Sequence, residues 1–378
     1  MTNVLTASEL LSRRRFAEFA GRRVGFIGNH TSRLADGTST HIALHGAPDV
    51  RLVRLFSPEH GAFGREDRED IGHETDPATG LPIYSLYGDT RKPTPAMLEG
   101  LDVLVCELQD IGARFYTYAS TLLLALEAAH DAGIAFCVLD RPNPITLAHV
   151  EGPLPDADKL SFVVSHTVPI RHGLTLGELA RLATADNGWS DVLSVVACEN
   201  LRRAQWWDET GVAWTDPSPA MRSLEAAILY PGVCLLEQTN VSVGRGTPAP
   251  FSLTGAPWID APRWAQYIDA HAGGGVRAEP HAFTPTLRTC EGEPCQGVRL
   301  TVTQRDALAS VRLGIALLCG LRDLHPDRFE MDRAVKLIAS QDVMDRLAAG
   351  QSVEEITASW QDDLSAWRKR ARPFRLYD

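Results

Sequence analysis

The amino-acid sequence predicts an α/β fold, in which a mostly parallel sheet is covered by helices on both faces and is followed by a smaller α+β lobe. Short apolar runs alternate with segments that carry apolar residues at helical spacing, which is the pattern of βαβ units. Hydrophobic residues make up 44% of the 378 positions and charged residues 22%, as in packed globular proteins. A chain of this length exceeds one average domain, so a second lobe is expected.

Six short apolar runs are the predicted strands of the sheet. They cover residues 24–29, 50–56, 101–109, 134–140, 167–172 and 191–198.

Helices are predicted from apolar spacing and from capping residues. Residues 120–133 have apolar positions at helical spacing and end in Gly133, a common helix stop. Thr175 with Glu178, and Ser352 with Glu355, match capping boxes that open two further helices. The N-terminal 26 residues are typical of an amphipathic helix rather than a signal peptide.

The composition of the chain changes near residue 255, so we predict one domain over 1–255 and a smaller one over 256–378. Glycine-rich and Pro/Cys-containing stretches follow this point. A strand is then predicted over 298–303 and a helix over 310–324.

Net charge excludes several classes of partner. The formal charge of −11 argues against nucleic acid and against an anionic membrane, since both need a basic surface. An anionic small molecule is still compatible with a local arginine pocket. The oligomeric state stays open.

Cysteine usage and apolar segments bear on location. No segment approaches the roughly 20 apolar residues of a membrane span. Seven cysteines, several inside apolar runs, fit buried thiols in a reducing compartment, so a cytoplasmic location is expected. Cys290 and Cys295 could pair or help to bind a metal, but no second Cys or His pair completes a zinc pattern, and no metal is expected.

Polar residues concentrate where predicted strands end, and in parallel sheets ligands bind at that edge. Asn29 ends the first run. The loops after later runs carry carboxylates, histidines, arginines and asparagine: Glu59, His60, Asp110, Arg114, Tyr116, Asp140, Asn143, Arg171 and His172. A later segment adds Glu237, Asn240 and Arg245.

Two or more carboxyl groups at one site are what glycoside hydrolysis requires. Arginines suit a substrate carboxylate, because the guanidinium binds it through two parallel hydrogen bonds. Each candidate also has a structural explanation. Glu59 and His60 would serve as a solvated loop pair, Asp110 as a helix cap, Glu237 as an acceptor for backbone amides, and Tyr116 as a core aromatic.

Several common α/β enzyme motifs are absent from the sequence. There is no G-x-G-x-x-G dinucleotide motif, no P-loop lysine motif, no G-x-S-x-G elbow and no zincin histidine pair. The absence of these motifs argues against a dehydrogenase, an NTPase or an esterase, without identifying a glycosidase.

Seven motifs in order resemble one family, over nearly the whole chain from about residue 20. The motifs are SPEHG (57–61), LPIYSLYG (81–88), LQDIGARFYTY (108–118), DRPNP (140–144), EGP (151–153), PIRHGLTLGELA (169–180) and YPGVCLLEQTNVSVGRGT (230–247). This series is similar to the exo-β-N-acetylmuramidases of glycoside hydrolase family 171, long described as domain of unknown function 1343.

The resemblance implies a Rossmann-like N-terminal domain and a smaller C-terminal domain that closes the cleft between them. It implies release of N-acetylmuramic acid from the non-reducing end of peptidoglycan fragments, in cell-wall turnover and recycling, with no cofactor. The family's PEHG glutamate falls on Glu59, the expected acid or nucleophile. Asp110 or Glu237 is the expected second carboxylate.

The same resemblance places further residues in the pocket, with the lactyl carboxylate of the sugar expected on Arg114, Arg171 or Arg245. The expected substrate-binding residues are Asn29, His60, Arg114, Tyr116, Asn143, Arg171, His172, Asn240 and Arg245. The alternatives are a muropeptide-binding sensor without turnover and a nucleotide-dependent enzyme on the same architecture.

Overall fold

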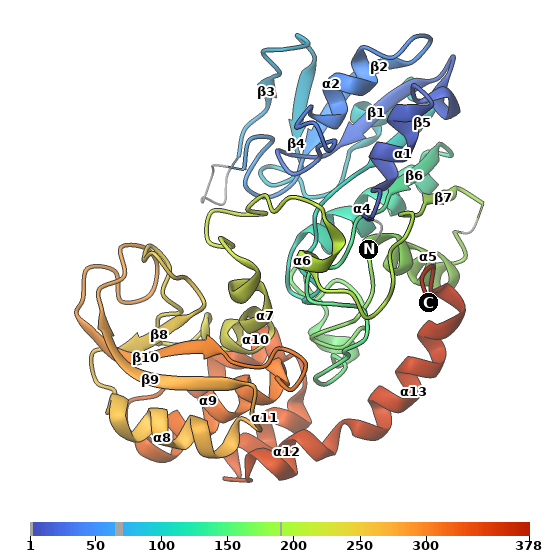
Figure 1. Ribbon diagram of the computed structural model, residues 1–378. Coiled ribbons are helices and arrows are strands. Elements are labelled where there is room, and N and C mark those ends of the chain that lie inside the picture. The colour runs from blue at the N-terminus through green and yellow to red at the C-terminus, as the bar shows by residue number, and fades with distance from the viewer. Residues whose placement is uncertain (1–2, 65–70, 190) are drawn as a thin grey trace.

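The first lobe of the computed structural model is built on a seven-stranded sheet (Figure 1). The structure describes residues 3–64, 71–189 and 191–378. The strand order is β3-β4-β2-β1-β5-β6-β7, and every pair is parallel except β3–β4. This architecture confirms the predicted α/β class. The strands are β1 (Arg23–Ile27), β2 (Arg51–Ser57), β3 (Glu74–Thr75), β4 (Pro82–Ser85), β5 (Val103–Cys106), β6 (Ala135–Leu139) and β7 (Leu193–Val196).

Helices cover both faces of this sheet, as alternate residues of the buried strand β5 show. Val103 and Val105 belong to a core that also holds Leu11 and Leu44 of α1 and α2. Leu104 and Cys106 belong to the other core, with residues of α4 and α5. A strand buried on both sides reads as a continuous apolar run. The helices of this part of the chain are α1 (Ala7–Arg13), α2 (Thr40–His45), α3 (Pro95–Leu98), α4 (Tyr118–Asp131), α5 (Leu176–Asn187), α6 (Trp207–Thr210) and α7 (Leu224–Val233).

A three-stranded antiparallel sheet, of order β8-β10-β9, forms the second lobe with its helices. α8 packs against β9 and against α9, and the long α13 runs back toward the first lobe (Figure 1). The elements are β8 (Leu253–Ala256), β9 (Val276–Phe283), β10 (Cys295–Val302), α8 (Ala261–His271), α9 (Ser310–Leu324), α10 (Val335–Ile338), α11 (Gln341–Ala348), α12 (Val353–Ser359) and α13 (Gln361–Ala371). Five short 3₁₀ helices, η1–η5, cover Ala17–Phe19, Ala157–Lys159, Cys234–Leu236, Met331–Ala334 and Arg372–Phe374.

The domain division predicted after residue 255 stays a prediction. Elements before and after this point are in close contact. β8 crosses this point and pairs with β10 of the second lobe. α7, which precedes the division by about twenty residues, packs on α9.

Most predicted elements are confirmed and one strand is wrong. The capping boxes at Thr175 and Ser352 open α5 and α12. Residues 167–172 form no sheet strand. The backbone of Arg171 instead pairs with that of Glu151 in both directions, at 3.0 Å each, and Ile170 O accepts from Arg114 N. These polar groups are satisfied by neighbouring loops, so they do not join the sheet.

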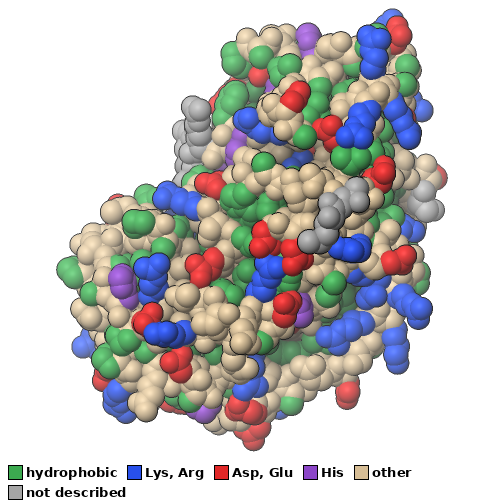
Figure 2. Space-filling model, viewed as in Figure 1, with side chains coloured by type: hydrophobic (Ala, Val, Ile, Leu, Met, Phe, Trp, Pro, Cys, Tyr) green, Lys and Arg blue, Asp and Glu red, His purple; other side chains and the backbone are tan. Residues whose placement is uncertain are grey.

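The surface is of mixed charge on the face seen in Figure 2, where acidic and basic side chains alternate over both lobes. No helix in the described parts of the chain has the length and apolar character needed to cross a bilayer.

Candidate active site

The loops that follow β2 and β5 meet at the carboxyl edge of the sheet, beside the point where the strand order reverses at β1. A pocket of about 500 Å³ opens there. Five of the predicted site residues line it: Glu59, His60, Tyr116, Glu237 and Arg245. The first three come from the first lobe, and the last two follow α7, so the pocket lies where the lobes meet.

A tight turn directly after β2 positions Glu59. Gly61 N donates to Pro58 O at 3.1 Å. His60 has φ +70° and Gly61 has φ +73°, and left-handed backbone at a non-glycine residue is often retained at functional sites. The Thr117 hydroxyl donates to Glu59 Oε2, which holds the carboxyl group against the loop after β5.

Glu237 occupies the end of the 3₁₀ turn that continues α7. Its carboxylate pairs with Arg245 Nε, and Cys234 Sγ donates to Glu237 Oε2 at 3.0 Å. Burial opposes the charge on Arg245, but the Glu237 carboxylate outweighs it and raises the guanidinium pKa. Gly244 and Gly246, at φ +75° and +77°, form the turn that presents Arg245.

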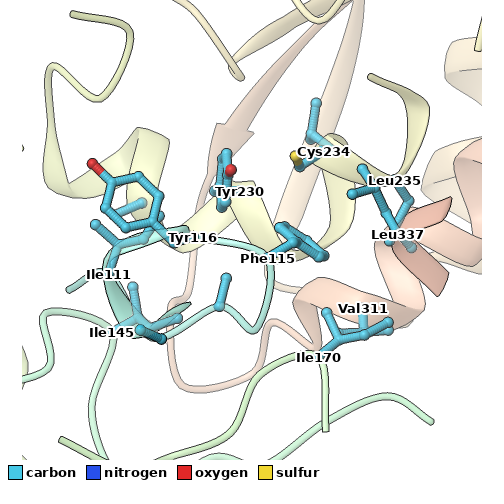
Figure 3. Packing of buried hydrophobic residues seen from close by; sticks show 14 of the residues in the cluster. Ile111, Phe115, Tyr116, Ile145, Ile170, Tyr230, Cys234, Leu235, Val311 and Leu337 are labelled. Atoms are coloured by element: carbon cyan, nitrogen blue, oxygen red, sulfur yellow. The ribbon is translucent and has the colours of Figure 1, made fainter. Parts of the chain in front are cut away.

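Tyr116 lies at the junction of the lobes, with its ring edge-to-face against that of Tyr230 (Figure 3). Tyr116 makes a second edge-to-face contact with the ring of Tyr118. Burial raises the pKa of its phenol well above the ordinary value, and the carboxylates of Asp110 and Glu59 add to that rise. The hydroxyl is therefore neutral at any physiological pH and able to donate a hydrogen bond.

Asp110 and His172 lie outside the pocket lining, in the buried layer next to Tyr116. Asp110 Oδ2 accepts from Gly112 N at 2.7 Å and lies 3.4 Å from His172 Nε2. His172 Nδ1 accepts from Leu174 N, so the proton of a neutral His172 ring is on Nε2, facing Asp110.

Arg114 and Arg171 are also buried away from the pocket, at 2% and 1% exposure. The two Nη atoms of Arg114 donate to four backbone carbonyls, those of Pro153, Val168, Leu337 and Ile338. Arg171 pairs with Glu151 and donates to Ile145 O.

The three predicted asparagines hold loops together. Asn29 donates to the Tyr118 hydroxyl at 2.9 Å and accepts from Thr31, beside a separate cavity of about 80 Å³. Asn143 bonds Leu174 O and Ile145 N. Asn240 bonds the backbone of Arg328 and Glu330. Substrate contact by these three residues stays a prediction.

Other residues that line the pocket were not predicted as site residues from the sequence, among them Tyr87, Arg91, Thr117, Phe162 and Arg288. Thr117 lies within the LQDIGARFYTY motif, and Arg91 follows the LPIYSLYG motif by three positions. β4 is parallel to β2, so the loop that carries Arg91 leaves the sheet at the same edge as Glu59. Recognising β4 as a strand would have drawn attention to it.

No metal centre is evident among the residues that the structure describes, since no three His, Cys, Asp or Glu side chains cluster there. Among the described residues that line the pocket, the chemistry available is that of two carboxyl groups, the imidazole of His60, three phenols and three guanidinium groups.

Comparison with known proteins places this arrangement in one family. Models of the exo-β-N-acetylmuramidase NamZ N-terminal and C-terminal domains match residues 24–225 and 228–377. A peptidoglycan β-N-acetylmuramidase NamZ of Bacillus subtilis (strain 168) is 38% identical over 364 residues, covering 95% of this chain and 88% of the relative.

Two solved structures of DUF1343 family proteins from Bacteroides fragilis NCTC 9343 share the fold. The first has a TM-score of 0.92 at 33% identity, with full coverage of both chains. The second has a TM-score of 0.80 at 27% identity, covering 100% of this chain and 99% of the other. The chain therefore belongs to the exo-β-N-acetylmuramidase NamZ family.

Proposed function

We propose that this chain is a glycoside hydrolase that releases N-acetylmuramic acid from the non-reducing end of peptidoglycan fragments. The observation that carries the proposal is that Glu59 and Glu237 line one pocket in different polar settings. Two carboxyl groups with separate roles are the machinery of most glycosidases. The activity named for the B. subtilis relative supports the same reaction.

The two carboxyl groups have different partners, which suggests their roles. Glu237 is ion-paired with Arg245 and suits the ionised role, either attacking the anomeric carbon or stabilising positive charge on it. The Glu59 carboxyl group instead accepts a hydrogen bond from the neutral hydroxyl of Thr117. It suits the acid, whose proton passes to the glycosidic oxygen as the bond to the anomeric carbon breaks. Tyr116 would then orient the sugar between them.

The proposal includes a place in the cell. The seven cysteines are free thiols, six of them buried, which fits a reducing compartment. We place the enzyme in the cytoplasm, where it would act on peptidoglycan fragments during cell-wall recycling. The reaction consumes water and needs no cofactor.

Turnover of a chromogenic β-N-acetylmuraminide, compared with the matching N-acetylglucosaminide, tests the proposal. Wild type should cleave the muraminide. Glu59→Gln keeps the shape of the side chain but has no proton to give, so its kcat should fall by about 10²–10⁴-fold. Glu237→Gln should fall by a similar factor. Glu99→Gln, at an exposed position outside the pocket, is the matched control and should keep wild-type turnover.

Two outcomes would count against the proposal. Near-wild-type turnover by a folded Glu59→Gln protein would remove the acid assignment. Saturable binding of muropeptides by wild type, with no product at high protein concentration, would favour a sensor instead.

A further inference from the structure

The pocket is locally cationic within an acidic protein. Its described lining contains three guanidinium groups, from Arg91, Arg245 and Arg288, against the two carboxylates of Glu59 and Glu237. The whole chain has a formal charge of −11. A surplus of fixed positive charge inside a concave site attracts an anionic group of the ligand.

The arginines predicted from the motifs are already committed to other partners. Arg114 uses both Nη atoms on backbone carbonyls, and Arg171 is paired with Glu151. Both are almost fully buried and neither lines the pocket. Arg245 is paired with Glu237, so a substrate carboxylate there would compete with a catalytic group.

Arg91, in contrast, lines the pocket and lies against two aromatic rings. Its guanidinium carbon lies 4.2 Å from the ring centre of Phe162 and 4.9 Å from that of Tyr87, and all three side chains line the pocket. Within the described parts of the chain, no carboxylate lies within 4.0 Å of it and it donates no hydrogen bond. Stacking on aromatic faces fixes a guanidinium plane while leaving its edge donors available.

We propose that Arg91, held by Phe162 and Tyr87, binds the carboxylate that distinguishes the substrate from a neutral amino sugar. This inference rests on the proposed function and deepens it, since N-acetylmuramic acid differs from N-acetylglucosamine by a lactyl ether that ends in a carboxylate. A planar guanidinium group whose N–H groups are free along one edge binds a carboxylate through two parallel hydrogen bonds. Arg91 is then the residue that sets specificity, while Glu59 and Glu237 perform the chemistry.

The test compares three substrates with the same leaving group: the muraminide, its lactyl methylamide and the N-acetylglucosaminide. Arg91→Gln should lower kcat/KM for the muraminide by about 10–100-fold, the usual cost of losing a charge-assisted pair, mainly through KM. Its effect on the neutral methylamide should stay within about threefold. Arg91→Lys should restore part of the preference for the muraminide, because lysine keeps the positive charge but lacks the two parallel N–H donors of a guanidinium.

Matched controls separate local from general effects of charge. Arg22→Gln removes the same charge at an exposed position before β1, at the opposite edge of the sheet, and should match wild type on all three substrates. Phe162→Leu removes one stacking face and should lower kcat/KM for the muraminide more than for the methylamide, which weakens the preference for the carboxylate.

Failure of this inference is distinguishable from failure of the proposed function. If wild type cleaves the muraminide and Arg91→Gln retains the full preference for the carboxylate, or if Arg288→Gln alone abolishes it, the assignment to Arg91 is overturned. If wild type cleaves nothing, binding of free N-acetylmuramic acid measured by calorimetry still decides the matter. Equal affinity of wild type and Arg91→Gln would refute the role of Arg91.

Discussion

Asp140, at the end of β6, shows how burial changes the acid–base behaviour of one residue. Its carboxylate accepts from the Thr175 hydroxyl at 2.7 Å, from Gly177 N at 2.9 Å and from the Tyr377 hydroxyl at 2.6 Å. Complete burial nevertheless raises its pKa from 3.8 to about 6, against the opposing effect of these hydrogen bonds. The folded protein therefore holds this proton more tightly than the unfolded chain does.

A pH-dependent difference in stability between wild type and Asp140→Asn follows from that pKa. The contribution of the acid to the free energy of unfolding is full below about pH 4 and is lost as pH rises through about 6. Asparagine does not titrate. The stability of wild type relative to the mutant should therefore fall between pH 4 and 7, by on the order of 3 kcal/mol at about 1.4 kcal/mol per pKa unit.

Urea unfolding at several pH values measures this difference. Asp191→Asn changes an exposed position in the same lobe. Its free energy of unfolding should depend on pH in the same way as that of wild type. If the free energy of unfolding of Asp140→Asn also followed the pH dependence of wild type, the pKa of Asp140 would not be raised in the folded state.

The sequence identified which loops form the site better than it identified which side chains enter the pocket. Glu59, Glu237 and Arg245 follow from their motifs and line the pocket. Arg114 comes from an equally specific motif, but its donors are used by buried carbonyls. A motif records that an arginine is present, whereas the partner of its guanidinium depends on segments far away in the chain.

At the scale of elements, the two lobes approach each other closely where α7 crosses α9. A Cβ built on Gly232 would lie 1.9 Å from Ser310 O, and one on Gly314 would lie 2.6 Å from Gly232 O. Glycine is needed here because two backbones touch, a close approach that only a missing side chain allows. Glu237 follows this crossing by five residues, so the crossing helps to place a catalytic group.

Gly232→Ala should separate the two helices and destabilise the protein. Alanine is the better helix former by about 1 kcal/mol, but the added methyl meets backbone that cannot rotate away. We expect a net loss of about 2–3 kcal/mol in the free energy of unfolding, together with lower turnover. Gly46→Ala is the control: this residue is exposed, has φ −82° and would place its Cβ 3.5 Å from Ile42 O. If both variants unfold at the wild-type denaturant concentration, the crossing is not close packed.

Local signals predicted helices well and strands less evenly. The capping boxes at Thr175 and Ser352 were readable because their partners lie three residues away. The run 167–172 has the composition of a strand, yet its backbone pairs with Glu151 and Ala113 in loops. Pairing partners of a strand lie at long range, so composition alone did not decide between a sheet and a loop pair.

At the scale of the whole molecule, the chain returns to its first lobe after completing the second. α13 crosses between them (Figure 1), and Arg181 Nη1 on α5 donates to the carbonyls of Phe374 and Arg375. The Tyr377 hydroxyl reaches Asp140 at the end of β6. The C-terminal residues therefore help to hold the two lobes in the arrangement in which Glu59 and Glu237 line one pocket. Composition placed the division after residue 255, but it could not show that β8 and α7 contact later elements.

Arg114 joins the lobes from within. It follows β5, and its Nη1 donates to Pro153 O at 2.9 Å and to Val168 O at 3.0 Å in the first lobe. Its Nη2 donates to Leu337 O at 2.9 Å and to Ile338 O at 2.7 Å on α10. Burial lowers the pKa of this guanidinium to about 9, so the charge is expensive to bury and is compensated by these four carbonyls.

Replacing Arg114 by methionine should uncouple the lobes, because a side chain of similar length then leaves four buried carbonyls without their donors. We expect the free energy of unfolding to fall by about 3–5 kcal/mol, as for other buried charged groups that lose their partner. Leu337 also lines the pocket, so KM for the muraminide should rise in any protein that still folds. Arg222→Met, at an exposed arginine that bonds one carbonyl, should lose less than about 1 kcal/mol. Equal denaturation midpoints for the two variants would mean that other contacts between the lobes hold the pocket together.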